Sequence, residues 1–174
     1  MPATQLTLGG FVARFEHTTL SSVLAAARVG AIEHQGDAGK SIYWLCYTVP
    51  RGKLSERVWI VAHGEMGGSD HAITEVSAEQ LPSGSVTPGG CPVLPPALRP
   101  LSLDRGISLG TSRSQLIHSL GRPSGVHDDW LDFVYVGKVK LPDQSTDWDE
   151  TSLLAARLFG GKVVALYASK VTSN

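Results

Sequence analysis

The sequence predicts an α+β fold of two tandem helix-plus-antiparallel-meander modules that share or abut one sheet, with the helices on one side. Three observations lead to this prediction. The chain has 174 residues, of which 42% are hydrophobic and 18% charged, so it can bury a core without a metal. Its 19 glycines and 10 prolines are typical of short strands joined by turns. In each half, one short helical pattern precedes several apolar segments.

The first predicted module covers residues 1–80 and begins with an amphipathic helix. Its apolar positions recur at the helical spacing and are Leu20, Val23, Leu24 and Ala27. Thr18 or Thr19 can cap the N-terminus of this helix, and Gly30 can end it in the left-handed conformation. The apolar segments that follow are predicted strands: Ser41–Val49, Val58–His63 and Ile73–Val76.

A segment rich in proline and glycine, residues 81–100, separates the two halves. It has neither the helical nor the strand period, and clusters of proline and glycine favour turns and irregular backbone. We therefore expect a linker that crosses the protein surface.

The second predicted module covers residues 101–174 and repeats the order of the first. Its helix has capping-box spacing at Ser112 and Gln115, and Gly121 followed by Pro123 ends it. The apolar stripe of this helix is Leu116, Ile117 and Leu120. The strands expected after it are Leu131–Lys140, Ser152–Phe159 and Lys162–Lys170. Only a pair of glycines separates the last two strands, which favours a tight hairpin.

The segment Gly106–Pro123 reads GISLGTSRSQLIHSLGRP. Its small glycine-and-serine start, short helix and final L-G-x-P resemble the β-lactamase inhibitory protein family. The second half also resembles the small lipoprotein of the outer-membrane barrel-assembly machine. The order of the predicted elements extends the first resemblance to the whole chain. The resemblance implies a tandem fold that binds another protein, as an inhibitor does, in the cell envelope or outside the cell.

The composition and the motifs argue against several kinds of function. The formal net charge is −1, so the chain lacks the basic footprint of a nucleic-acid-binding protein. No run of 18 apolar residues marks a transmembrane segment. The nucleophile-elbow, phosphate-loop and dinucleotide motifs do not occur in the sequence. We therefore expect no cofactor and no catalytic residue. We expect a protein partner, and the sequence does not identify it.

The two cysteines leave the redox state open. Cys46 lies in an apolar predicted strand and Cys91 in the linker, and neither belongs to the C-x-x-C pair of zinc ribbons and thioredoxins. The alternatives are a disulfide between them or two free thiols. The first residues lack the basic and apolar regions of a signal peptide. We expect a periplasmic or secreted protein if such a signal has been removed, and a cytoplasmic one otherwise.

The leading functional hypothesis is a non-enzymatic protein-binding module that presents a sheet face to its partner. The candidate partner-binding residues are the strand aromatics Trp44, Tyr47, Trp59 and Tyr135, with Trp130 and Trp148 in loops at the rim. Side chains alternate along a strand, so Trp44 and Tyr47 point to opposite faces and only one of them can be open. The aliphatic pair Val134 and Val136 suits a core better, which favours the Tyr135 side as the open one.

The alternative hypothesis is an enzyme, or a metal or small-ligand binder, with a site near His63 and Glu65. These residues and His71 lie around a glycine-rich turn that can bring the ends of two strands together. The competing interpretation is a polar hairpin turn at the surface, which we prefer, and we expect no metal.

Overall fold

The computed structural model describes residues 1–37, 40–64, 70–82, 91–140 and 146–173. Within these ranges the protein is strand-rich and mixed, with two α-helices and two antiparallel sheets. The elements of the first half are β1 (Gln5–Leu8), β2 (Phe11–Arg14), α1 (Leu20–Ala27), β3 (Glu33–Gln35), β4 (Ser41–Arg51), β5 (Leu54–Gly64) and β6 (Glu75–Pro82). Those of the second half are the short 3₁₀ turns Pro96–Leu98 and Asp104–Gly106, β7 (Leu101–Leu103), α2 (Arg113–Leu120), β8 (Gly125–His127), β9 (Trp130–Val139), β10 (Trp148–Phe159) and β11 (Lys162–Ser173).

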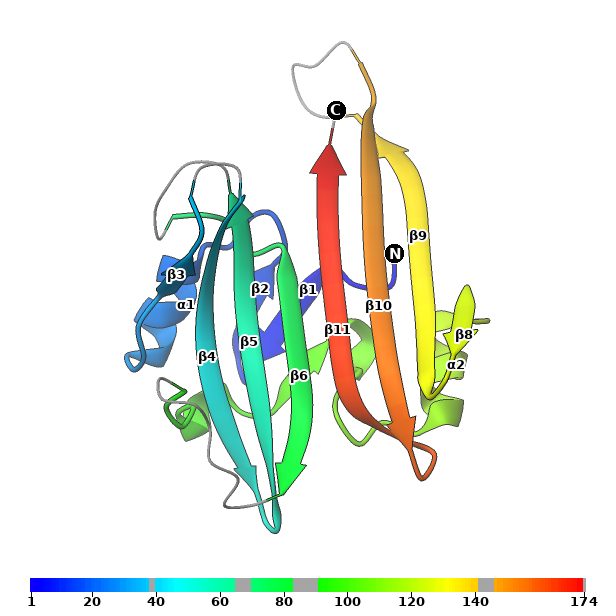
Figure 1. Cartoon of the computed structure of the whole chain (residues 1–174), viewed down its shortest axis with the longest axis horizontal. Helices are drawn as coiled ribbons and strands as arrows, with labels where there is room; N and C mark the ends of the chain where they lie inside the picture. The colour runs from blue at the N-terminus through cyan, green and yellow to red at the C-terminus, as the bar shows by residue number, and fades with distance from the viewer. Residues whose placement is uncertain (38–39, 65–69, 83–90, 141–145, 174) are drawn as a thin grey trace.

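The large sheet joins the two halves of the chain (Figure 1). Among the described residues its strand order is β3-β4-β5-β6-β11-β10-β9-β8, and all neighbours are antiparallel. The meander β4-β5-β6 comes from the first half and β9-β10-β11 from the second. They meet where β6 pairs with β11, from Glu79 opposite Ala165 to Glu75 opposite Ser169. The antiparallel sheets predicted from the sequence are thus present, while the interpretation of the halves as a repeat stays a prediction.

A small sheet, which the sequence analysis did not predict, has the order β2-β1-β7 in the described part of the chain. Its strands have only three or four residues, too few to show a clear alternation. Figure 1 shows β1 and β2 behind the large sheet. Leu6 and Leu8 of β1 and Leu103 of β7 are buried in the core, so the small sheet closes the core over one face of the large one.

The hydrophobic core forms one cluster that draws on every layer. The large sheet contributes alternate residues of its long strands, among them Leu45, Val58, Ile60, Leu154 and Ala156. Helix α1 adds Leu20, Val23 and Ala27, and helix α2 adds Leu116. Each of these helices has eight residues, too few to cross a membrane, which takes about 20.

The helix ends follow the predicted caps at three of four positions. The Thr19 hydroxyl accepts a hydrogen bond from the Ser22 backbone amide at the start of α1. The capping box of α2 is present, and Gly121 ends that helix with a φ of 84°. The prediction for the end of α1 was wrong, because Arg28 and not Gly30 takes the left-handed C-cap, with a φ of 57°.

The second part of the predicted linker is not a simple surface crossing. Residues Leu81 and Pro82 still belong to β6, residues 83–90 lie outside the described ranges, and the chain then follows β4. The Thr48 amide donates to the Pro92 carbonyl and the Leu94 amide donates to the Thr48 carbonyl, each at 2.9 Å. Leu94 is completely buried.

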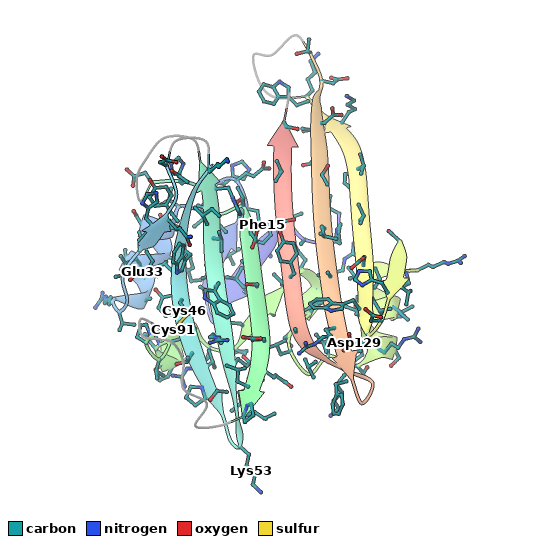
Figure 2. The ribbon with its side chains drawn as sticks, in the orientation of Figure 1. Phe15, Glu33, Cys46, Lys53, Cys91 and Asp129 are labelled. Atoms are coloured by element: carbon teal, nitrogen blue, oxygen red, sulfur yellow. A yellow bond between two sulfur atoms is a disulfide. The ribbon has the colours of Figure 1, made fainter. Side chains whose placement is uncertain are left out.

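A disulfide joins Cys46 of β4 to Cys91 of the linker (Figure 2). It resolves the alternatives that the sequence left open for the two cysteines. Because Cys46 lies on β4 beyond the residues that pair with β3, and Cys91 directly precedes the segment that pairs with Thr48, the disulfide holds the linker against this part of the β4 edge.

A network of ion pairs connects the turn after β2 to the ends of β10 and β11. The Lys170 ammonium is 2.6 Å from a Glu16 oxygen and 3.0 Å from a Glu150 oxygen. Thr172 also donates its hydroxyl to Glu16, at 2.8 Å. Burial raises the pKa of Glu16, but the hydrogen bonds from Lys170 and Thr172 outweigh it and the net shift is downward.

Candidate binding face

The outer face of the large sheet consists of the side chains that alternate with those of the core. On the first-half strands they are Trp44 and Cys46 of β4, Arg57, Trp59, Val61 and His63 of β5, and Glu75, Ser77 and Glu79 of β6. On the second-half strands they are Tyr167 and Ser169 of β11, Leu153, Ala155 and Arg157 of β10, and Trp130, Asp132, Val134 and Val136 of β9. We call this set the outer face.

Two aromatic side chains lie in one row across the middle of the outer face. Trp59 of β5 is opposite Ser77 of β6, and Ser77 is opposite Tyr167 of β11. Neighbouring strands are about 4.8 Å apart, so the two rings flank a small serine at roughly twice that spacing. The row crosses the β6–β11 junction, and therefore both halves of the chain contribute to it.

The guanidinium of Arg57 lies over the Trp59 ring. Its guanidinium carbon lies 4.5 Å from the centre of the indole ring, a cation–π distance. The same guanidinium donates from Nε to a Glu79 carboxylate oxygen at 3.1 Å. Because the guanidinium is bonded to Glu79 and contacts the indole ring, Trp59 has a positioned neighbour. A partner that binds this ring would therefore have little side-chain entropy to overcome.

Glu75 connects three strands of the outer face. It accepts a hydrogen bond from the Tyr167 hydroxyl at 2.9 Å and lies 3.1 Å from His63 Nε2. Burial and then the negative charge of Glu75 raise the pKa of Tyr167, so this phenol stays a hydrogen-bond donor at neutral pH. The contact fixes the Tyr167 ring across the junction of the two halves.

Three of the predicted aromatic residues lie on the outer face. Trp44 and Trp59 are there, half-buried, as strand residues. Trp130 is also there, but as the first residue of β9, opposite Arg157, and not in a loop. Their exposed ring edges leave apolar area in contact with water.

Tyr47 is wrongly assigned to the binding face, because it is a core residue. Only 1% of its surface is exposed, and its hydroxyl donates to the Val29 carbonyl at 3.1 Å. Burial raises the pKa of Tyr47 to about 12. As the alternation requires, Tyr47 and Trp44 point to opposite faces of β4, and the core takes Tyr47.

The prediction that the Tyr135 side of β9 is open was also wrong. Phe133 shares that side and is buried, while Val134 and Val136 point to the outer face and are exposed, Val136 at 71%. The larger ring of Phe133 fills more of the core than a valine would, which decides the orientation of the strand. Tyr135 keeps 38% of its surface exposed because it lies where the strand runs past the core.

Trp148 does not belong to the outer face either. It is the first residue of β10 and follows the core-side alternation with Glu150 and Ser152. Its indole Nε1 is buried.

Tyr167 is the outer-face aromatic that the sequence analysis did not select. The signal was present in the sequence, since Leu166 and Ala168 on either side of it are core residues. Two aliphatic neighbours, one on each side of it, would have placed Tyr167 on the opposite face.

The alternative site near His63 is only partly described. Glu65 lies outside the described residues, and His63 pairs with Glu75. The His71 ring lies close to Gly64 and 5.4 Å from the Tyr43 ring. In the part of the chain that the structure describes, no three His, Cys, Asp or Glu side chains are grouped closely enough to hold a metal ion.

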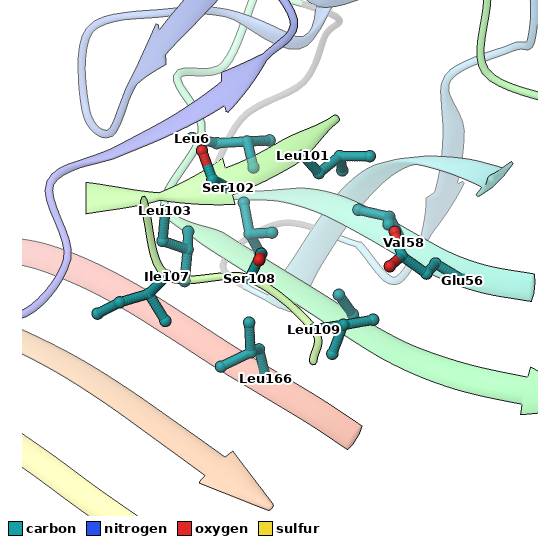
Figure 3. Close-up of a pocket in the computed structure, with 12 residues that line it drawn as sticks. Leu6, Glu56, Val58, Leu101, Ser102, Leu103, Ile107, Ser108, Leu109 and Leu166 are labelled. Carbon is teal, nitrogen blue, oxygen red and sulfur yellow. The ribbon is translucent and has the colours of Figure 1, made fainter. Parts of the chain in front are cut away.

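An apolar cavity lies between the two sheets (Figure 3). Its lining includes Leu6, Val58, Ile107 and Leu166, and one charged residue, Glu56. Its volume of about 20 Å³ is room for roughly one water molecule, so it is a packing defect and not a substrate site. Burial raises the pKa of Glu56, although the guanidinium of Arg51, 2.6 Å away, counteracts it.

No known protein family, curated protein or solved structure matches this chain. The proposed function therefore rests on the outer face of the large sheet.

Proposed function

We propose that this chain is a non-enzymatic protein-binding module, inhibitor-like and located in the periplasm or outside the cell. Its outer face binds the partner, and both helices lie on the opposite, core side of the large sheet. The observation that carries the proposal is the fixed row of half-exposed aromatics, Trp59 and Tyr167, which the β6–β11 junction brings together.

The chemistry of the outer face suits a protein partner. Aromatic residues and arginine are enriched at the energetic centres of interfaces, because they bury a large area with few rotatable bonds. Trp59 and Arg57 are such a pair, and Glu79 and Glu75 supply polar groups around them. Trp59, Arg57, Glu75 and Glu79 line none of the cavities between the sheets, beside β9 and at the β10–β11 turn, so a partner meets this part of the face as a surface.

The proposed location rests on the disulfide. A bond between Cys46 and Cys91 persists in oxidising compartments and is rare in the cytosol. The inhibitor-like role follows the resemblance of the segment Gly106–Pro123 to inhibitory proteins, and it names no enzyme.

The test is affinity capture followed by direct titration. The protein, immobilised through its N-terminus, captures partners from the source organism's envelope and culture fluid, and mass spectrometry identifies them. The purified partner is then titrated against the native protein and Trp59→Ala. We expect Trp59→Ala to weaken binding by about 2 kcal/mol, roughly 30-fold, or more. Its free energy of unfolding should fall by only about 1 kcal/mol, the scale of the cation–π contact that is lost.

The matched control is Phe159→Ala. Phe159 is an aromatic residue at the β10–β11 turn and is exposed at 80%, so it tests whether any exposed ring attracts the partner. Binding unchanged in Phe159→Ala and weakened in Trp59→Ala supports the outer face. Equal binding by the native protein and Trp59→Ala contradicts it.

A further inference from the structure

The two edges of the large sheet differ in how much of each is paired with a neighbouring segment. At the β4 edge, β3 pairs with residues Ile42 to Trp44, and the linker, held by the disulfide, pairs at Thr48. At the other edge, β8 pairs with β9 only from Trp130 to Asp132. In the described part of the chain, the rest of β9 therefore has no strand paired to it on the side away from β10.

The bare part of β9 presents unpaired backbone groups. The Asp132 carbonyl accepts from Ser124 and the Val134 amide donates to the Ser124 hydroxyl, so these two residues direct their backbone groups away from β10. Backbone groups alternate in an antiparallel strand, and the amides of Val136 and Lys138 consequently point the same way. Within the described residues, nothing accepts a hydrogen bond from the Val136 amide.

A positively charged hollow lies beside this edge. Its volume is about 190 Å³, and its lining includes Tyr135, Ser124, Arg105 and Arg122 but no acidic residue. That volume holds several water molecules or one side chain. The Arg105 guanidinium donates to the Ser119 carbonyl, which orients it.

Two carboxylates of the outer face near this edge are already paired with basic side chains. Asp132 is paired with His127 at 2.8 Å and Asp149 with Lys138 at 2.6 Å. Lys140 adds a further positive charge at the end of β9. The β9 edge therefore has unpaired backbone, apolar side chains at Val134 and Val136, and positive charge in the hollow beside Tyr135.

We propose that the bare β9 edge binds an extended acidic segment of another protein by strand addition. The segment pairs its backbone with Val136 and Lys138, beyond Val134, whose amide already donates to Ser124. Every second side chain of an added strand points to the Tyr135 side, and an Asp or Glu there reaches the Arg105–Arg122 hollow. The site is separate from the Trp59–Tyr167 row on β5 and β11, so it does not rest on the proposed function.

A second copy of this chain fits the edge less well. Pairing two β9 edges antiparallel around Val136 would bring two copies of Arg122, Lys138 and Lys140 to one seam. Lysines on an edge strand discourage such self-pairing, whereas an acidic segment neutralises them.

The test uses two synthetic peptides and the full chain. Both peptides have seven residues that alternate valine and threonine, with blocked ends, and differ in carrying one glutamate or one glutamine at the central threonine position. Affinities are measured by fluorescence anisotropy, and amide exchange at Val136 by NMR. We expect the glutamate peptide to slow Val136 exchange at least tenfold at saturation and to bind at least tenfold more tightly than the glutamine peptide.

Two variants and one control localise the effect. Val136→Pro removes the backbone amide that points away from β10, a change that an edge strand tolerates. It should weaken the binding of the glutamate peptide at least tenfold. Arg122→Gln should remove the preference for glutamate over glutamine. The matched control Arg113→Gln makes the same charge change on α2, outside the hollow, and should leave both affinities unchanged, as should Trp59→Ala.

Unchanged Val136 exchange with saturating peptide would overturn the proposal, as would equal affinities for the two peptides. This exchange measurement uses the native chain and stays decisive even if Val136→Pro does not fold. A concentration-dependent dimer without peptide, with Val136 exchange slowed on dimerisation, would assign the edge to a second copy and also overturn it.

Discussion

Removal of the Cys46–Cys91 disulfide is the sharpest test of how the first half is held together. The perturbation is the double variant Cys46→Ala, Cys91→Ala, which leaves every hydrogen bond of the β4 edge available. The bond closes a sequence separation of 45 residues. On the chain-entropy relation, a loop of this length corresponds to a loss of about 4 kcal/mol in the free energy of unfolding.

This magnitude is a large part of the total, because domains are stable by about 5–15 kcal/mol. The loss acts mainly on the unfolded chain, which becomes less restricted. A smaller, local effect falls on the linker, whose described contacts with β4 include the hydrogen bonds between Thr48, Pro92 and Leu94. We therefore expect the Leu94 amide to exchange faster in the variant, by more than the global loss explains.

The assay is urea unfolding followed by tryptophan fluorescence, on the oxidised native protein, the reduced native protein and the double variant. The free energies of unfolding of the reduced protein and the variant should agree within about 1 kcal/mol, because both lack the bond. The small remaining difference comes from the sulfur atoms, which only the variant lacks. Both should fall about 4 kcal/mol below the oxidised protein. A difference of less than 1 kcal/mol between oxidised protein and variant would refute the loop-closure reasoning.

Two further predictions concern the ion-pair network. Lys170→Met should cost about 3 kcal/mol in urea unfolding, the lower end of the range for a broken buried pair, because buried Glu150 and half-buried Glu16 both lose this ammonium. Lys138→Met, which breaks an exposed pair, should cost no more than about 1 kcal/mol, and equal losses would contradict this. The lowered pKa of Glu16 gives stability that is present above its ordinary pKa of 4.5 and is lost as pH falls through the lowered value. As pH falls below 4.5, the urea midpoint of unfolding should therefore drop less steeply in Glu16→Gln than in the native protein. Parallel curves of midpoint against pH would show that Glu16 does not contribute to the pH dependence of stability.

The parts of the fold that the sequence predicted are those with a long period or a distinct cap. The strands β4, β5, β9, β10 and β11 were found because each contains an apolar segment of six or more residues, and in the structure each has ten to twelve residues. The capping box of α2 was found because it depends on two residues at a fixed spacing. The strand β7 was missed because its pairing with β1, such as Leu6 with Leu103, joins segments far apart in the chain and leaves no local signal. The strands β1 and β2 form a local hairpin across Gly9 and Gly10, but with four residues each they are too short to show a clear alternation.

The orientation of each strand was the hardest part of the site to predict. Alternation shows which side chains share a face, but the choice of core face depends on what packs there. Tyr47 can enter the core because the Val29 carbonyl accepts a hydrogen bond from its hydroxyl, a contact set by the chain after α1. Phe133 turns inward where Val134 stays out, so aliphatic character alone was a poor guide to burial.

The β6–β11 junction explains why the outer face could not be predicted from either half alone. Trp59 and Tyr167 are more than a hundred positions apart in the sequence, and only the pairing of Ser77 with both strands places their rings in one row. The hydrogen bond from Tyr167 to Glu75 crosses the same junction. A change that separates β6 from β11 would therefore divide the row even if each meander stayed folded. The binding face is thus a property of the joined sheet, and a partner that needs both rings should bind neither half when it is expressed alone.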